Sequence, residues 1–272
     1  MSSVKCEFCD NEMIKSWSGL YNRCGQTNYP YQLMKCDTCH LSMIFPKPSN
    51  TTYPQTRVDK DTTADFVAVD TIKWDQALLD KVRKHKGPGT DLLELGCNEG
   101  NFLRVADSYG YKCEGLEIDD IAAKSGMKKS SFIRQGDFLT EEFNKKYDII
   151  ILNHVLEHIP DIKSVSAKLR ALLKPDGVII INIPHIDGWI AQLMKSNWCQ
   201  LSPHTHVWFF SKTFAKNFFK ANFGSIKMAT TSNCEPMGLV PFSLKLLIKN
   251  IIILISNMLG KGDELYIELK EP

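Results

Sequence analysis

The fold of this chain follows from one stretch, Leu92-Leu93-Glu94-Leu95-Gly96-Cys97-Asn98-Glu99-Gly100. Residues 92–95 are typical of a short buried strand, residues 96–100 of a tight loop, and residues 101–106 of the start of a helix. A strand, a glycine loop and a helix, with an acid at the strand end, usually frame a nucleotide-like cofactor. A dinucleotide loop would place glycines where the chain has Asn98 and Asn101, so the spacing argues against a bound pyrophosphate.

The composition is that of a soluble globular protein, and it gives no support for a nucleic-acid-binding surface. The 272 residues suffice for one large domain or for one domain and a small module. The net charge is +2, and acids and bases are spread along the chain, so we expect no nucleic-acid partner. The residues Met1 to Lys5 lack the apolar core of a signal peptide, which predicts a cytoplasmic protein.

Two C-x-x-C pairs mark the first 48 residues as a zinc-ribbon module. They are Cys6 with Cys9 and Cys36 with Cys39, and four thiolates from two tight turns complete a tetrahedral site that favours structural Zn²⁺. The alternative, redox pairs or free thiols, lacks a thioredoxin-like frame around either pair. Cys24 and His40 are spare ligands. We expect strands over residues 31–35 and 41–45, and a linker with a helix at about 64–86 within residues 49–88.

Residues 89–272 alternate between strand and helix patterns. The expected strands cover 91–95, 111–117, 131–134, 147–152 and 177–183, and the expected helices 99–109, 119–127, 140–145 and 161–173. We expect residues 172–177 to form a helix stop and turn. This alternation predicts an α/β fold with a Rossmann-like parallel sheet and helices on both faces. A cofactor should then lie at the carboxyl ends of the strands.

Acids follow the second and third strands of this predicted sheet. Glu117, with Ile118 beside it, can accept hydrogen bonds from both hydroxyls of a ribose, whereas a helix N-terminal acid is better supplied by Asp119 or Asp120. Asp137 can accept from the amino group of an adenine, and Phe138 can offer its backbone amide or its ring. The alternative is that Asp137 caps the next helix, which Thr140 could also do.

The fourth strand runs into a polar segment that we expect to border the cofactor. Asn153, His154 and His158 are the candidate pocket residues, and the two histidines share a face in a helical turn. The spacing is similar to that of a metal pair, but the acid is not placed as in H-E-x-x-H, so a pocket role is favoured.

Two histidines further along are candidates for a general base. His204 and His206 precede an aromatic strand, and a neutral imidazole can remove a proton at physiological pH. The alternative is that both orient a loop. Ser211 should cap a helix over about 212–222, with strands at 223–230 and 265–269.

Residues 239–259 are strongly apolar, but their longest unbroken apolar run is Ile251 to Ile255. That is short of the roughly 18 apolar residues of a membrane span, so we expect a packed amphipathic helix. A dimer contact or a membrane-surface contact is the alternative.

These motifs together resemble those of class I methyltransferases that use S-adenosylmethionine. Glu94, Gly96 and Gly100 match the E-x-G-x-x-x-G motif, and Asn98, where many members have glycine, tolerates the positive φ that the turn needs. The H-V-L-E-H segment at 154–158 is similar to that of small-molecule methyltransferases, and it is not the [DN]-P-P-[YF] loop of enzymes that methylate nucleobase or amide nitrogens.

One group within this class is particularly similar, namely the zinc-containing enzymes that methylate sugars or sugar nucleotides in bacterial glycan and antibiotic pathways. It combines a four-cysteine module, an E-x-G-x-N-[DE]-G loop and an H-E-H-x-x-x-F-S segment, matched here by His204 through Ser211. The resemblance implies methyl transfer to a sugar, sugar nucleotide or surface-glycan precursor, with Glu94, Gly96, Asn98 and Gly100 around the methionine part of the cofactor.

Two departures from that group favour a hydroxyl over a carbon acceptor. Thr205 replaces the acid between the two histidines, and the long C-terminal domain of the carbon-methylating members is not expected here. Two other interpretations stay open: an RNA or protein methyltransferase whose zinc ribbon docks the macromolecule, and a non-catalytic zinc-ribbon scaffold.

Overall fold

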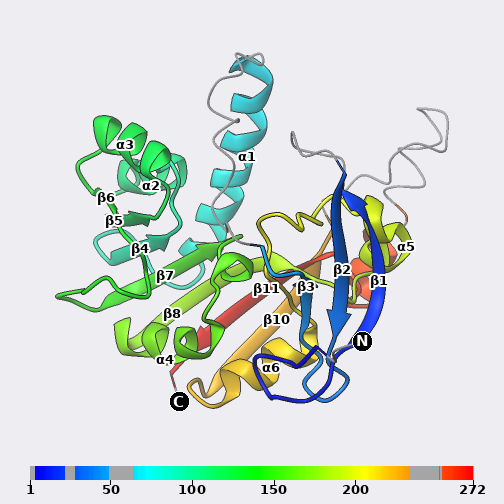
Figure 1. The fold of residues 1–272 in the computed structure, drawn as a ribbon. Coiled ribbons are helices and arrows are strands. Elements are labelled where there is room, and N and C mark those ends of the chain that lie inside the picture. Colours follow the sequence, from blue (N-terminus) through cyan, green and yellow to red (C-terminus); the bar gives the residue numbers. More distant parts are fainter. Residues whose placement is uncertain (1–3, 22–27, 49–63, 233–250, 252, 272) are drawn as a thin grey trace.

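The computed structural model describes residues 4–21, 28–48, 64–232, 251 and 253–271, and for residues 64–73 only the backbone. Figure 1 shows a large sheet flanked by helices, with three N-terminal strands packed beside it.

The large sheet holds seven strands among the described residues, in the order β10-β11-β8-β7-β4-β5-β6. They are β4 (Asp91–Leu95), β5 (Lys112–Glu117), β6 (Ile133–Gln135), β7 (Tyr147–Asn153), β8 (Leu173–Pro184), β10 (Ser225–Thr231) and β11 (Glu264–Lys270). The strands β4 to β8 are parallel, as the alternating pattern predicts. The sheet as a whole is mixed, because β11 runs antiparallel to both β8 and β10. The direction of a strand depends on how the chain connects it to its neighbour. The periodicity of the side chains carries no information on that connection, so it could not predict the antiparallel β11.

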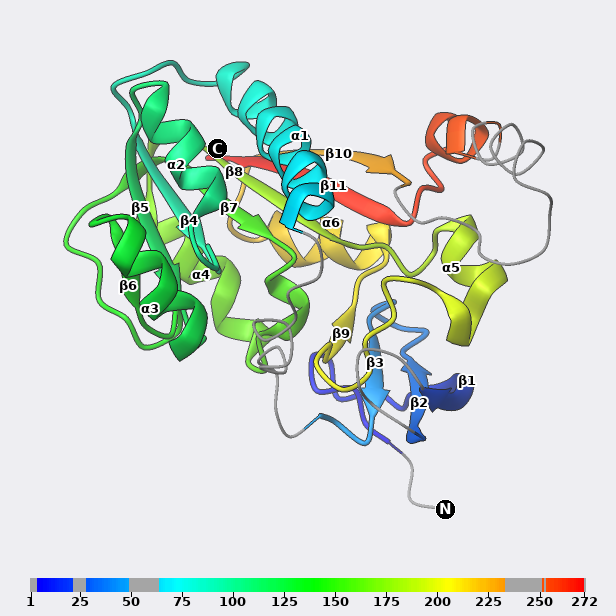
Figure 2. The same cartoon turned by 90° about the horizontal axis from the view of Figure 1, so that it is seen from above.

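Alternate residues of the central strands face two different helical layers, as expected for strands buried on both sides. Ile149 and Ile151 of β7 face α1 (Ala64–Arg83) and α2 (Asn101–Ser108). Ile150 and Leu152 face α4 (Ile162–Leu172) and α6 (Lys212–Lys220), on the other side of the sheet (Figure 2). The helix α3 (Asp120–Lys129) packs by β6, and Ser211 caps α6 through its hydroxyl, as predicted.

One local prediction was wrong. No helix forms over 140–145, where Lys168 donates instead to the carbonyl oxygens of Leu139 and Glu141, at 2.9 Å and 2.8 Å. The helix stop expected at 172 is confirmed, because α4 ends at Leu172. The turn that follows interrupts the pairing of β8 with β7 between Leu173 and Val178, and Asp176 has a φ of 60° there.

The N-terminal module is built into the core of the larger domain. The strands β1 (Ile14–Tyr21), β2 (Tyr29–Lys35) and β3 (Ser42–Phe45) form an antiparallel sheet, in which β2 and β3 were predicted and β1 was not. The short strand β9 (Trp208–Phe209) extends this sheet by pairing with β3. Leu33 and Ile44 share a buried cluster with Trp198 and Phe209. The domain boundary at residue 48 stays a prediction, but side chains from both sides of it pack in one buried cluster.

The apolar segment 239–259 lies largely outside the described residues. Its described part is helical at 251 and 253–258 and exposes five apolar side chains, Ile251, Leu254, Ile255, Met258 and Leu259. None of the helices in the described ranges has the length and hydrophobicity needed to cross a membrane.

Because the two parts share a core, the substitution Ile44→Ala should destabilise the whole chain. Ile44 is fully buried, and such a truncation costs about 2–5 kcal/mol. We expect one cooperative thermal transition at lower temperature, measured by circular dichroism and by tryptophan fluorescence. Ile14→Ala is the matched control, because Ile14 is 54% exposed on β1. A separate, earlier transition of the module alone would contradict the shared core.

Candidate functional site

The loop after β4, residues 96–100, has the conformation that the sequence predicts. Gly96, Asn98 and Gly100 have φ values of 69°, 52° and 73°, which confirms that Asn98 adopts the left-handed region. The Asn98 Oδ1 accepts from the backbone N–H of Glu99 at 2.7 Å, which stabilises the turn. A Cβ on Gly96 would lie 2.4 Å from Cγ2 of Val155, so the loop packs closely against the segment that follows β7.

Buried acids lie under this loop. Glu94 is 6% exposed, and burial raises its pKa well above the usual value, with further contributions from the charges of Asp75 and Glu117. Its Oε2 is buried and has no hydrogen-bond partner among the described residues. A buried unpaired carboxylate oxygen is costly, and a cationic ligand group such as an ammonium would satisfy it.

Asp75 is a member of this acidic group that the sequence did not indicate. It lies on α1, where burial raises its pKa to about 6, although the charge of Arg104 opposes the shift. The rest of α1 and the strand β4 separate Asp75 from the loop motif, and Asp75 belongs to no recognisable pattern, so only the packing of α1 reveals it.

Glu117 connects the loop to the end of β5. Its Oε2 accepts from the backbone N–H of Asn98 at 2.7 Å, and its Oε1 accepts from that of Asp119 at 2.8 Å. Each carboxylate oxygen has a second lone pair, so both can also accept from a ribose hydroxyl. Ile118 is 51% exposed beside it and offers an apolar surface to a ring. The ribose role stays a prediction.

The third predicted cofactor contact is at Asp137 and Phe138, and interactions within the protein already use some of its groups. Asp137 Oδ1 accepts from the backbone N–H of Leu139 at 2.9 Å, so this carboxylate does cap a turn, although no helix follows. Phe138 is buried, with the Lys168 ammonium 5.3 Å from its ring centroid. An adenine contact is therefore left to the other Asp137 oxygen and to the backbone amide of Phe138, and it stays a prediction.

The segment after β7 carries a charged histidine. His154 contacts the carboxylates of Glu157 at 3.3 Å through Nδ1 and of Glu264 at 3.6 Å through Nε2. Burial alone would lower its pKa, but these two hydrogen-bonded acids raise the pKa of His154 to about 10. Its imidazole is therefore protonated at neutral pH and cannot act as a base. Asn153 Oδ1 accepts from the side-chain amide of Asn182 at 3.3 Å, which links the ends of β7 and β8.

His204 and His206, which precede β9, are brought to the same end of the sheet as His158. His206 is 4% exposed, and burial, followed by the neighbouring histidines, lowers its pKa well below the usual value. Its ring meets that of His158 edge-on, with centroids 4.7 Å apart. The pKa of His204 is also lowered, first by burial and then by His158, and its ring lies 5.3 Å from that of Tyr21 in β1. Both imidazoles are therefore neutral at physiological pH, as a base requires, while the choice between them stays a prediction.

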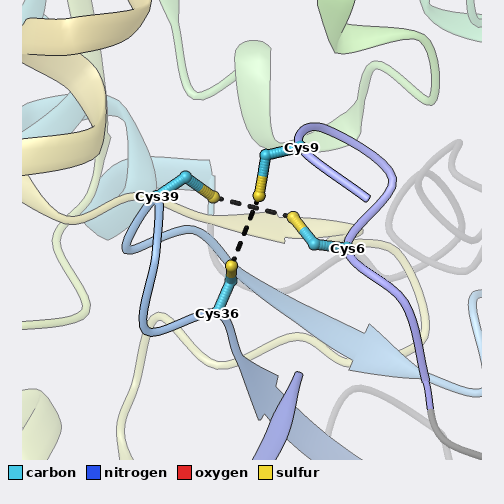
Figure 3. Close-up of side chains that lie close together, drawn as sticks. All are labelled: Cys6, Cys9, Cys36 and Cys39. Atoms are coloured by element: carbon cyan, nitrogen blue, oxygen red, sulfur yellow. Dashed lines mark hydrogen bonds between the residues drawn. The ribbon is translucent and has the colours of Figure 1, made fainter. Parts of the chain in front are cut away.

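The four predicted cysteine ligands meet in the N-terminal module (Figure 3). The Sγ atoms of Cys6 and Cys39 are 3.6 Å apart, and those of Cys9 and Cys36 are 3.5 Å apart. A tetrahedral site with Zn–S distances of about 2.3 Å requires sulfurs about 3.8 Å apart, so the cluster fits Zn²⁺. His40 is not among the ligand atoms of this cluster, and Cys24 lies outside the described residues.

Comparison with known proteins gives the class of this chain. A family model described as a methyltransferase domain matches residues 72–225, and the chain belongs to this family. The fold is accordingly the Rossmann-like methyltransferase fold, joined here to a four-cysteine module that is consistent with zinc binding.

Curated relatives match a part of the chain. The ubiquinone biosynthesis O-methyltransferase of Actinobacillus pleuropneumoniae serotype 7 is 28% identical over 106 residues, covering 35% of this chain and 45% of that protein. The ribosomal protein L11 methyltransferase of Dictyoglomus turgidum is 28% identical over 114 residues, covering 38% of this chain and 36% of the relative. The chain thus spans less than half the length of either relative.

Solved structures support the fold. A methyltransferase from Archaeoglobus fulgidus that depends on S-adenosylmethionine superposes with a TM-score of 0.54 at 20% identity, covering 72% of this chain and 92% of that one. Phosphoethanolamine N-methyltransferase 2 of Haemonchus contortus, in complex with S-adenosyl-L-methionine, gives a TM-score of 0.53 at 14% identity, covering 74% of this chain and 52% of that one.

The substitution Gly96→Ala should abolish binding of S-adenosylhomocysteine, measured by calorimetry. The new Cβ would lie 2.4 Å from Val155 Cγ2 on a residue with positive φ, so the loop must move. Gly87→Ala is the control, because a Cβ there meets no atom within 4 Å. Wild-type affinity in Gly96→Ala would show that the loop does not form the binding site.

Binding of S-adenosylhomocysteine should strengthen as the pH rises from 5 to 7. Ionised Asp75, whose pKa is about 6, adds negative charge beside Glu94, and the ligand carries a cationic ammonium. The raised pKa of Asp75 has the opposite effect on folding. The free energy of unfolding falls as the pH rises from 3.8, the pKa of Asp75 in the unfolded chain, through about 6, its pKa in the folded chain.

The substitution Asp75→Asn should therefore flatten the pH dependence of binding and raise the stability of the free chain at pH 7. Asp80→Asn, an exposed position on the same helix, is the matched control and should keep the wild-type profile. An unchanged pH profile in Asp75→Asn would show that Asp75 does not act on the ligand.

Proposed function

We propose that this protein transfers a methyl group from S-adenosylmethionine to a hydroxyl of a sugar, sugar nucleotide or surface-glycan precursor. The observation that carries the proposal is the series of acids at the carboxyl ends of three adjacent strands. Glu94 is the last but one residue of β4, Glu117 is the last residue of β5, and Asp137 follows β6, in a chain of the methyltransferase family.

The side chains present suit this cofactor. The loop at 96–100 would hold its methionine part, Glu94 would face its ammonium, Glu117 would accept from its ribose and Asp137 from its adenine. The cofactor supplies a methyl group on a sulfonium, which is already a good leaving group. The protein then has to align the acceptor oxygen, exclude water and remove the hydroxyl proton.

The residues at the ends of β7 and β9 support an oxygen acceptor. His204 and His206 supply neutral imidazoles, which can take a hydroxyl proton. The N-terminal module borders this region, because Tyr21 and Tyr29 both lie against the ring of His204. We propose that the module, held by structural Zn²⁺, forms one wall of the acceptor site. The sugar acceptor itself rests on the resemblance carried by the cysteine module, the loop and the segment from His204 to Ser211.

A second proposal concerns the segment 239–259, which we propose to make a membrane-surface or dimer contact. The exposed side chains Ile251, Leu254, Ile255, Met258 and Leu259 in its described part support such a contact.

A screen of acceptors, read by production of S-adenosylhomocysteine, tests the function. We expect turnover with sugar nucleotides or glycan precursors, and none with phenols or with a ribosomal protein. Turnover confined to the phenol or protein acceptors would overturn the sugar assignment. A chain that fails to bind S-adenosylhomocysteine by calorimetry would be a non-catalytic scaffold.

The same assay identifies the base. Loss of a general base typically lowers turnover by about 10²–10⁴-fold. We expect a loss of this size in His206→Ala or in His204→Ala, with cofactor affinity unchanged, and each variant serves as the control for the other. Wild-type turnover in both variants would exclude the two histidines as bases.

A further inference from the structure

Three side chains that the sequence did not group come together beside the candidate site. They are Glu157 and His158, on the short 3-10 helix η2 (Leu156–His158), and His206, in the loop before β9. One ligand atom from each lies within 4.8 Å of the others. Glu157 is fully buried and His206 is 4% exposed, so this is not a chance group on the surface.

The two backbone segments that carry these side chains are held together by hydrogen bonds. Val207 donates its backbone N–H to the carbonyl of Glu157 at 2.9 Å. The Trp208 indole Nε1 donates to the carbonyl of Ile159 at 2.8 Å. These contacts fix the two segments against each other beside the group, so its geometry is set before any ligand binds.

Two of the three residues make the supporting hydrogen bonds that are usual for metal ligands. His158 Nδ1 lies 3.1 Å from the Thr205 carbonyl, and since a carbonyl only accepts, this nitrogen is the N–H and Nε2 carries the lone pair. Glu157 Oε1 accepts from His154. A metal-bound imidazole usually donates its second nitrogen to a carbonyl or carboxylate, and a ligating carboxylate is itself hydrogen-bonded, as seen here.

Two polar atoms of this group are buried without a hydrogen bond, which is unfavourable. Glu157 Oε2 and His206 Nδ1 are buried and find no hydrogen-bond partner in the part of the chain that the structure describes. Each such atom costs about 1–3 kcal/mol, and more where it belongs to a charged group. A cation bound by Glu157 and His206 through these two atoms would satisfy both.

We infer that Glu157, His158 and His206 bind a divalent transition-metal ion, distinct from the ion of the four cysteines. Two imidazoles and one carboxylate suit first-row ions such as Zn²⁺, Fe²⁺ or Mn²⁺, and three protein ligands leave coordination positions open. The motif H-E-x-x-H, in which both histidines lie on one helix, does not describe this site, since one histidine comes from a distant segment.

The place of the ion gives it a role that rests on the proposed function. Val155, two residues before Glu157, packs against Gly96 of the loop, so the ion lies at the cofactor side of the site. An acceptor hydroxyl bound at an open position would have a lowered pKa. Its proton passes to a base, the oxygen bonds to the methyl carbon, and the carbon–sulfur bond of the sulfonium donor breaks with its electron pair going to sulfur. With His206 bound to the ion, His204 is the histidine left to take the proton.

Metal content tests the site without an activity assay. The full chain, equilibrated with Zn²⁺ and freed of excess metal, should hold two ions per chain by elemental mass spectrometry. Glu157→Gln and His206→Ala should each hold one, with the affinity of the second site lowered at least about 100-fold, since even substitutions around metal ligands cost 10–100-fold. Cys36→Ser should lose the other ion. His204→Ala, a neighbouring histidine outside the group, is the control and should keep two.

A titration of the wild-type chain with Co²⁺ removes any dependence on the folding of variants. One equivalent should give the intense thiolate-to-cobalt charge-transfer band of the cysteine site, and a second should bind without that band. A single equivalent in the wild type, or two ions retained in both Glu157→Gln and His206→Ala, would overturn the metal site. Neither result bears on binding of S-adenosylhomocysteine or on the acceptor screen, so failure of this site and failure of the proposed function are distinguishable.

Discussion

The carboxylate of Glu117 holds together the parts of the molecule on which the site depends. By accepting from the backbone N–H groups of Asn98 and Asp119, it fixes the loop after β4 to the end of β5 and to the start of α3. Charge-assisted bonds of this kind are short and strong, and they hold Asn98 in the left-handed conformation that the loop requires. The loop in turn leaves space at Gly96 for Val155, which sets the position of the segment from Asn153 to His158.

The N-terminal module contributes to this arrangement through packing rather than by a tether. Strand β9 begins two residues after His206 and pairs with β3, so the candidate base region and the cysteine cluster are joined to the same small sheet. Phe8, between the ligands Cys6 and Cys9, packs on Phe214 of α6 with ring centroids 5.0 Å apart. A structural ion bound by the four cysteines would therefore stabilise the proposed wall of the acceptor site as well as the module itself.

The electrostatics of the site divide it into two halves. Around β4 and β5, Glu94, Glu117 and Asp75 make a buried acidic environment, which suits the cationic end of an amino acid. Around β7 and β9, His154 is held protonated by two acids, while His204 and His206 are held neutral by burial. The acidic half suits cofactor binding, and the histidine half suits chemistry on an acceptor.

The sequence by itself determined the class of fold, the loop with its left-handed Asn98, the acids at the strand ends and the four cysteines, because each depends on residues close together in the chain. Periodicity places strands, and C-x-x-C spacing brings two thiolates to one turn. Only the tertiary structure decided the antiparallel β11, the shared core of the module and the domain, the place of Asp75 and the meeting of Glu157 and His158 with His206. These features join segments that are far apart in the chain. Whether a buried histidine is charged or neutral likewise depends on which carboxylates the fold places beside it.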